Sequence, residues 1–195
     1  MKKRIYAYYE SLQELPQIEE FACANAWKQS WEAQGWECIM LNGSHAKNSN
    51  LYYKLIKKLV SIAPHLPPEA TSAMSKIIAR YKRWCALHAS GGGWMSDYDV
   101  ANIAFTPTVA EEFEKTGTIH VVTCEPAYLF YATPSHCNAA ISKFISEDVH
   151  KDGVMLFESE ILGVEDSINA LAELLFHGER GKAKKKSEQL AEIVK

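Results

Sequence analysis

Short apolar segments rich in β-branched and aromatic residues alternate along this chain with longer amphipathic segments. The short segments have the length and composition of strands, whereas the longer ones repeat apolar residues at helical spacing. Predicted strands cover residues 5–9, 36–41, 94 onward, 119–124 and 127–132. Predicted helices cover residues 19–35, 51–63, 74–88 and 109–115, a segment from Pro134, and a last segment that carries Val164 to Leu175 and ends at Gly178. This alternation predicts an α/β fold with a sheet flanked by helices, in which ligands collect outside the carboxyl ends of the strands.

The composition predicts one globular domain. Of the 195 residues, 47% are hydrophobic and 23% are charged, a balance that excludes a disordered chain. We expect the domain to span residues 1–178, followed by a basic, polar tail over residues 179–195. The net charge of −3 gives no field that attracts DNA or RNA, so nucleic acid is not an expected partner.

Two further features of the sequence indicate the cellular compartment of the protein. No apolar stretch is long enough for a transmembrane helix, and the basic start lacks the apolar core of a signal peptide. The five cysteines are widely spaced and include no Cys-x-x-Cys pair, which favours reduced, mostly buried thiols. We therefore expect a cytoplasmic protein without a membrane-spanning segment.

The most informative chemistry follows the predicted helix 74–88. Gly91 to Gly93 let the backbone turn sharply into the next strand and permit a ligand to approach closely. Asp97 and Asp99 stand two residues apart, and in a strand this spacing directs both carboxylates to one face. A cation between two such carboxylates relieves their repulsion, and Mg²⁺ or Mn²⁺ prefers oxygen ligands. The pattern predicts a metal site, while spacing alone leaves an exposed acidic turn as the alternative.

The segment of residues 80–100 resembles the sugar-binding region of a glycosyltransferase family with the GT-A fold. Members typically carry an arginine, the leucine-bearing end of a helix, two glycines, three residues and Asp-x-Asp. Gly92, Gly93, Asp97 and Asp99 occupy the corresponding positions here. Further stretches resemble the family in the same order along the chain: residues 25–31, residues 35–37 and residues 132–136.

The resemblance implies a Rossmann-related single domain that moves a hexose from a nucleotide diphosphate sugar to a glycan or another hydroxyl acceptor. It also implies Mn²⁺ or Mg²⁺ as the cofactor, held by Asp97 and Asp99, and retention of the anomeric configuration. If the third glycine is an insertion, Arg83 aligns with the arginine that binds the donor. The helical position of Arg83, opposite the apolar stripe, leaves a solvated arginine as the alternative. Arg80 stands where many members carry an acidic residue, and we include it among the candidate donor-binding residues.

Other candidates come from the ends of predicted elements. Tyr8 and Tyr9 end the first strand, where GT-A enzymes place the nucleotide base, although core packing is the alternative for either ring. Tyr98 alternates with the two acids and can hydrogen-bond near them. Many GT-A enzymes take a third metal ligand from the C-terminal segment, and His177 stands where that ligand would fall. A histidine that interacts with a helix dipole is the alternative for His177.

Two other functions remain open at this point. A metal-dependent hydrolase of nucleotide sugars would use the same site with water as the acceptor. A non-catalytic protein that binds sugar nucleotides would keep the fold without turnover. The three tryptophans Trp27, Trp31 and Trp36 are predicted to be core residues, since their spacing accounts for them. The chain has no Gly-x-Gly-x-x-Gly, P-loop or His-Glu-x-x-His motif to support another enzyme class.

Overall fold

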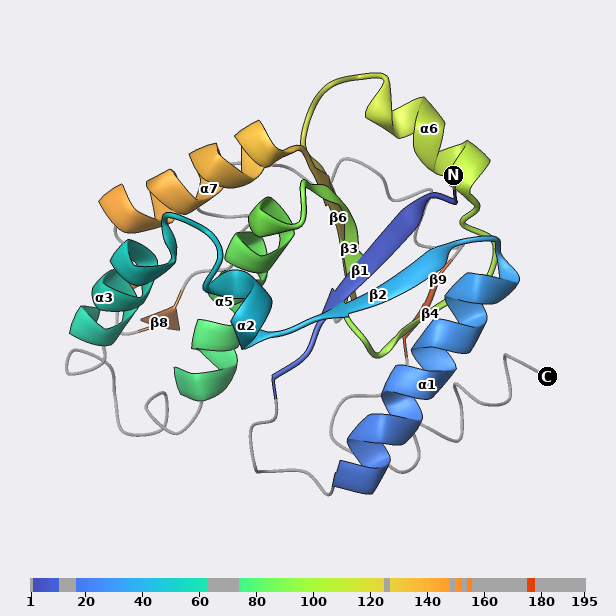
Figure 1. Cartoon of the computed structure of the whole chain (residues 1–195), viewed down its shortest axis with the longest axis horizontal. Helices are drawn as coiled ribbons and strands as arrows, with labels where there is room; N and C mark the ends of the chain where they lie inside the picture. The colour runs from blue at the N-terminus through green and yellow to red at the C-terminus, as the bar shows by residue number, and fades with distance from the viewer. Residues whose placement is uncertain are drawn as a thin grey trace.

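The computed structural model describes residues 2–10, 17–62, 74–124 and 127–147, together with residues 150–151, 154–155 and 175–177. Figure 1 shows a central sheet with helices on both sides of it. The predicted α/β class is therefore confirmed, and the sheet is mixed. The predicted tail of residues 179–195 lies outside the described residues.

The main sheet has five strands in the order β2-β1-β3-β6-β5. Their bounds are β1 Arg4–Tyr8, β2 Glu37–Leu41, β3 Gly93–Ser96, β5 His120–Cys124 and β6 Ala127–Ala132. Strand β1 is parallel to β2 and β3, whereas β6 is antiparallel to both β3 and β5. Because β1, β2 and β3 are parallel, the loops that follow them leave the sheet at one edge.

Helices pack on the two faces of this sheet (Figure 1). Helices α1 (Gln17–Ala33) and α6 (Pro107–Glu114) pack on one face. In the described part of the chain, the helices on the other face are α2 (Gly43–Ala46), α3 (Tyr52–Ile62), α5 (Met74–Ala89) and α7 (Pro134–Ser146). None of the helices in the described part of the chain has the length and apolarity needed to cross a membrane.

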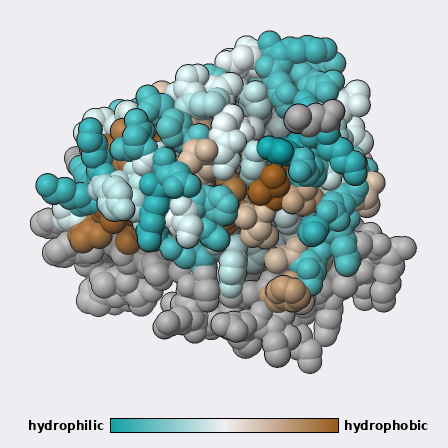
Figure 2. All heavy atoms as spheres, viewed as in Figure 1, coloured by the Kyte–Doolittle hydropathy of each residue, from teal (hydrophilic) through white to brown (hydrophobic). Residues whose placement is uncertain are grey.

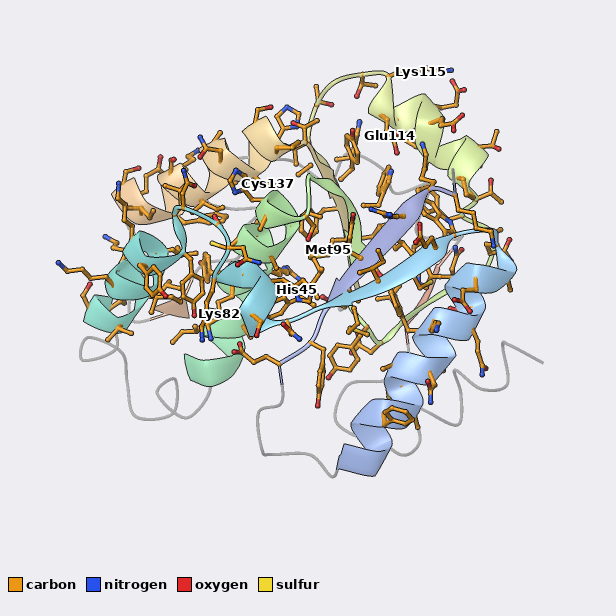
Figure 3. The ribbon with its side chains drawn as sticks, in the orientation of Figure 1. His45, Lys82, Met95, Glu114, Lys115 and Cys137 are labelled. Atoms are coloured by element: carbon orange, nitrogen blue, oxygen red, sulfur yellow. The ribbon has the colours of Figure 1, made fainter. Side chains whose placement is uncertain are left out.

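Strand alternation divides the core into two parts. Ile5 and Ala7 of β1 face α1, whereas Tyr6 and Tyr8 face α5. We call the first side the tryptophan face, since its buried cluster comprises Ile5, Ala7, Trp27, Trp31, Trp36, Trp94, Val100, Phe105, Ala110 and Leu129. We call the second side the α5 face, and Met95, at the centre of the sheet, belongs to it (Figure 3).

The glycine run joins α5 to β3 in a compact turn. The Gly92 amide donates to the Leu87 carbonyl at 2.9 Å and the Gly91 amide to the His88 carbonyl at 3.2 Å, which is the hydrogen-bond pattern of a Schellman cap. Gly91, Gly92 and Gly93 all have positive φ, at 91°, 75° and 130°. The sharp turn predicted here is therefore confirmed.

At Gly92 and Gly93 it is the protein's own chain that approaches closely, whereas the sequence predicted the approach of a ligand. A Cβ on Gly92 would lie 2.7 Å from the Ala132 carbonyl oxygen, and one on Gly93 would lie 3.1 Å from the Tyr6 ring. The absence of side chains lets the turn pack against the end of β6 and against β1. Only glycine satisfies both the positive φ and the contact at Gly92.

Two further pairs of strands lie outside the main sheet. Strand β4 (Val100–Asn102) pairs antiparallel with β9 (Leu175–His177), and β7 (His150–Lys151) pairs with β8 (Val154–Met155). The sequence placed Leu175 at the end of a helix, and this prediction is wrong because Leu175 begins β9. Backbone pairing with β4 therefore outweighs the helical spacing of the apolar residues before it. The rest of that predicted helix, residues 164–174, lies outside the described residues.

Candidate functional site

The acidic pair lies in a tight turn at the carboxyl edge of the parallel strands. The Val100 amide donates to the Asp97 carbonyl at 3.1 Å, which closes a four-residue turn between β3 and β4. The prediction that Asp97 and Asp99 share one face of a strand is therefore wrong, since β3 ends at Ser96. Both aspartates are half-buried instead on one turn, with Tyr98 between them.

The turn follows β3 at the edge where β1 also ends. Ala7 of β1 is in register with Ser96, the residue just before the turn. The chain after β1 therefore leaves the sheet beside the acidic pair. Tyr9 lies there, and its ring meets the Tyr98 ring edge to face, with centroids 5.6 Å apart. The structure thus brings Tyr9 and Tyr98 together at the turn.

Tyr8 has a different environment from Tyr9. Its ring is buried in the α5 face, and its hydroxyl donates to Glu10 Oε2 at 3.2 Å. Burial and the neighbouring Glu10 carboxylate raise the pKa of Tyr8 well above its ordinary value. Lys82 of α5 in turn donates to Glu10 Oε1 at 2.9 Å (Figure 3). Of the two tyrosines considered for the nucleotide base, Tyr8 is the one that packs in the core.

Arg83 is buried and ion-paired with the acidic turn. Its Nη1 donates to Asp97 Oδ1 at 2.7 Å, and only 6% of the residue is exposed. Its guanidinium carbon lies 5.5 Å from the centre of the Phe130 ring, within cation–π range. The alternative of a solvated arginine is therefore wrong. A buried guanidinium requires a partner anion, and Asp97 supplies it because α5 and the turn meet at the sheet edge.

Arg80 lies on α5 three residues before Arg83 and is half-buried. Residues three apart on a helix are neighbours on its surface, so Arg80 lies almost one helical turn before Arg83, the residue that pairs with Asp97. Arg83 is joined directly to the turn through Asp97, and Arg80 lies on the same helix.

Two tryptophan side chains of α1 form hydrogen bonds to the residues on either side of the acidic turn. Trp27 Nε1 donates to Ser96 Oγ at 2.8 Å, and Trp31 Nε1 donates to the Val100 carbonyl at 2.9 Å. The prediction that these residues are buried is confirmed, but their hydrogen bonds were not predicted. Their four-residue spacing shows that they share a helix face, and it does not reveal which loop that face meets.

The same helix holds the segment after the turn. Ser30 Oγ accepts a hydrogen bond from the Asn102 amide at 3.1 Å. Trp36, just before β2, donates through Nε1 to the Phe105 carbonyl at 2.6 Å. The Asn102 side chain closes the intervening loop, since its Oδ1 accepts from the Phe105 amide at 2.8 Å. The acidic turn is thus part of a segment whose backbone is bonded to buried side chains over most of its length.

The C-terminal strand β9 reaches the turn through the backbone. In the β4–β9 pair, His177 is in register with Val100, the residue that follows Asp99. The resemblance to GT-A enzymes suggested His177 as a third metal ligand, and the strand pairing brings its backbone beside the acidic turn. Among the described residues, no three His, Cys, Asp or Glu side chains form a group suited to a metal ion.

Comparisons with protein-family models, with curated proteins and with solved structures gave no match to this chain. The functional interpretation therefore rests on the chemistry and geometry of the site and on the sequence resemblance.

Proposed function

We propose that this chain is a metal-dependent glycosyltransferase of the GT-A type. It would move a hexose from a nucleotide diphosphate sugar, such as a UDP- or GDP-sugar, to a hydroxyl of a glycan or another acceptor. The observation that carries the proposal is the acidic turn of Asp97 to Asp99 at the carboxyl edge of the parallel strands, with Arg83 paired to Asp97. The mixed sheet, with three parallel strands beside an antiparallel one, is compatible with a Rossmann-related GT-A fold.

The donor atoms of the turn suit Mn²⁺ or Mg²⁺. Asp97 and Asp99 supply carboxylate oxygens, the ligands that hard divalent cations prefer. Arg83 already neutralises Asp97, so we assign direct metal binding to Asp99, with Asp97 binding directly or through water. His177 is the candidate third ligand, on the basis of its register with Val100. Magnesium in nucleotide sites is commonly held by one or two carboxylates, with phosphates and water as the other ligands.

The roles of the chain's own residues follow from their positions. Arg83 presents a buried positive charge beside the turn, where it would stabilise the negative charge that develops on the leaving diphosphate. Tyr9 and Tyr98 offer aromatic surface for the nucleotide base at the same edge. A bound divalent ion would supply Lewis-acid neutralisation of that leaving group. The bond from the anomeric carbon to the diphosphate breaks, the acceptor oxygen bonds to that carbon, and the acceptor proton is released.

The first experiment identifies the donor. Thermal unfolding is measured with UDP-, GDP- and CDP-sugars, each with Mn²⁺ and with a chelator. A bound donor raises the unfolding temperature in proportion to the logarithm of its concentration over its dissociation constant. We expect stabilisation by one nucleotide class that requires Mn²⁺. Stabilisation by no donor at saturating concentration would contradict the proposal.

The second experiment tests turnover with a matched pair of variants. Asp99→Asn removes a carboxylate charge from the turn, whereas Glu112→Gln removes one from a highly exposed position on α6. We expect Asp99→Asn to lose about 100-fold or more of the transfer rate, since metal stabilisation contributes several kcal/mol. Glu112→Gln should keep the rate. Free sugar formed equally fast with and without an acceptor would identify a hydrolase, and binding without turnover would identify a non-catalytic binding protein.

A further inference from the structure

One long stretch of the sequence is basic because it contains almost no acidic residues. Residues 38–96 contain eight Lys or Arg and a single acidic residue, Glu69, whereas the whole chain has a net charge of −3. Within this region, residues 38–62 carry four lysines and no acid, and they form β2, α2 and α3. This stretch is therefore basic although the protein as a whole is acidic, and such an excess of positive charge favours an anionic partner.

The basic residues of α5 and of α3 differ in their partners. Lys82 and Arg83 of α5 are engaged by Glu10 and Asp97. Lys54 and Lys57 of α3 are exposed and form no ion pair with another described residue. Their charges therefore remain available to a partner at the surface.

Helix α3 also exposes apolar side chains. Tyr52, Leu55, Leu59 and Ile62 are buried against the core, and this accounts for one side of the helix. Tyr53 and Val60 lie seven residues apart, on another side, and are 71% and 55% exposed. They are two of the four large hydrophobic residues that are exposed in the described part of the chain. Burial in the core thus explains only part of the apolar surface of α3.

The exposed apolar side chains adjoin the lysines. At 100° per residue, Tyr53 and Val60 lie between the buried side of α3 and the side that carries Lys54 and Lys57. Figure 2 shows hydrophilic and hydrophobic surface next to each other at the left edge of the molecule, where Figure 1 places α3. We call the surface of Tyr53, Lys54, Lys57 and Val60 the α3 patch.

The composition of the α3 patch fits a lipid surface better than a macromolecule. A tyrosine and a valine beside lysines match interfacial helices, in which apolar side chains enter the membrane boundary and lysines stay at the level of the phosphates. A stable protein interface requires about 800 Å² from each partner, far more than four side chains on one short helix provide. Nucleic acid would pair with the lysines but would gain nothing from Val60. The patch therefore matches an anionic membrane.

We propose that the α3 patch docks this protein on an anionic membrane surface. Tyr53 and Val60 insert at the boundary between headgroups and acyl chains, and Lys54 and Lys57 pair with lipid phosphates. Each lysine contributes about 1 kcal/mol near such a surface, so the attachment is reversible and weakens with salt. The inference is independent of the sugar-nucleotide site, since it uses other residues and another part of the surface.

Vesicle sedimentation tests the proposal with the full chain. The vesicles contain phosphatidylcholine alone or phosphatidylcholine mixed with phosphatidylglycerol. We expect the protein to sediment with the mixed vesicles only, and to be released by high salt. Lys54→Glu with Lys57→Glu should weaken this binding about tenfold or more, because two attractive charges become repulsive. Tyr53→Ser with Val60→Ser should weaken it about tenfold through lost apolar insertion.

The controls use equally exposed positions elsewhere. Phe21→Ser on α1 removes an apolar side chain that is 70% exposed, and Lys115→Glu after α6 reverses an exposed charge. Both controls should bind the mixed vesicles as the unchanged protein does, and all variants should keep the same circular dichroism and unfolding temperature. The proposal is overturned if the unchanged protein does not bind the mixed vesicles, or if the α3 variants bind them as well as the controls do. It is also overturned if the unchanged protein binds an RNA oligonucleotide instead of the vesicles.

Discussion

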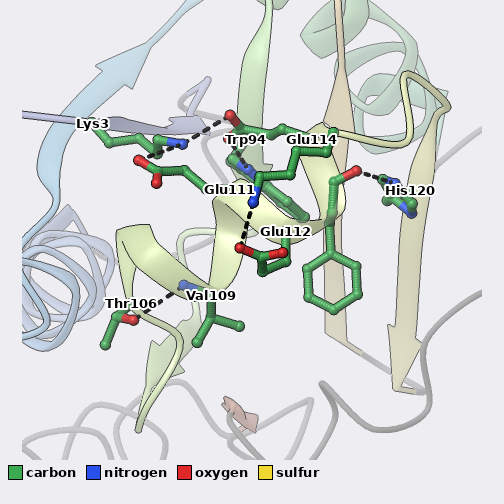
Figure 4. Close-up of polar contacts among 10 residues, drawn as sticks. Lys3, Trp94, Thr106, Val109, Glu111, Glu112, Glu114 and His120 are labelled. Atoms are coloured by element: carbon green, nitrogen blue, oxygen red, sulfur yellow. Dashed lines mark hydrogen bonds and ion pairs between the residues drawn. The ribbon is translucent and has the colours of Figure 1, made fainter.

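Each of the two faces of the central sheet carries a buried cluster, but the faces differ in the hydrogen bonding of their tryptophans. On the tryptophan face, the indoles of Trp27, Trp31 and Trp36 each donate a hydrogen bond of 2.6–2.9 Å. Trp94, on the same face, donates to Glu114 Oε1 at 2.7 Å, and Lys3 pairs with the other oxygen of that carboxylate (Figure 4). On the α5 face, Trp84 stacks on Phe130, and its indole nitrogen has no hydrogen-bond partner among the described residues.

This difference separates two kinds of packing. Stacking and apolar contact hold α5 against the sheet without specifying a position to within an ångström. Indole hydrogen bonds are directional, and those of α1 and Trp36 end on Ser96, Val100 and Phe105, in the segment that carries the acidic turn. The tryptophan face therefore positions the turn, and the α5 face supplies the charge of Arg83 that pairs with it. A site that holds its acidic residues in place needs both contributions.

The largest loss of stability is expected at the glycine turn that joins α5 to β3 of the central sheet. Gly92→Ala would place a Cβ 2.7 Å from the Ala132 carbonyl oxygen while keeping φ at 75°. Backbone strain and the clash with backbone atoms should together lower the free energy of unfolding by roughly 2 to 5 kcal/mol. Urea unfolding followed by tryptophan fluorescence measures this loss.

Gly91→Ala is the matched control for the clash. Gly91 also has positive φ, at 91°, but a Cβ there would meet no atom within 4 Å. Its loss should be limited to the strain of a left-handed residue, about 1 to 2 kcal/mol. Equal losses for the two variants would show that the close packing at Gly92 does not matter.

A smaller effect tests the hydrogen bonds directly. Trp31→Phe removes the indole donor from the buried Val100 carbonyl, whereas Trp84→Phe removes an indole nitrogen that forms no hydrogen bond. Both variants lose similar volume, so the difference between their unfolding free energies isolates the hydrogen bond. We expect Trp31→Phe to be less stable than Trp84→Phe by about 1 to 2 kcal/mol. Equal losses, or a larger loss for Trp84→Phe, would remove the distinction between the two faces.

Local patterns predicted most of the fold. Strand and helix periodicity located the five strands of the main sheet and the helices α1, α3, α5, α6 and α7, because each element shows its own spacing of apolar residues. The failure at Leu175 has a physical reason. Strand β9 is three residues long and exists by pairing with β4, which lies far away in the sequence. No local window of sequence contains that information.

The sequence identified residues of the candidate site but did not predict how they are arranged. Asp97, Asp99 and Arg83 were singled out from residue types and resemblance, and the structure joins Arg83 to Asp97. A turn at the acidic pair was named only as the alternative, because strand alternation was extended past Ser96. The contacts of Trp27 and Trp31 were missed because an indole predicts burial equally well with or without a hydrogen-bond acceptor.

An effect that is absent at neutral pH is a pH dependence of stability that differs between the faces. Burial raises the pKa of the Cys85 and Cys137 thiols on the α5 face from 9.0 to about 12. Below pH 9 these thiols are protonated in both states, and between pH 9 and about 12 only the unfolded chain loses the protons. The contribution of these thiols to stability should therefore be constant below that range and fall within it, by roughly 1 kcal/mol per thiol for each pH unit.

Cysteine variants assign this slope to the α5 face. Cys85→Ala should flatten the fall of the unfolding free energy above pH 9, because one buried thiol no longer titrates. Ile141→Val, in the same cluster, should lower stability by about 1 kcal/mol at every pH and leave the slope unchanged. Cys38, which packs against the tryptophan face, also has a raised pKa of about 12, but it is partly exposed. Solvent screening should make its contribution smaller, so a slope that responds more to Cys38→Ala than to Cys85→Ala would contradict the difference between the faces.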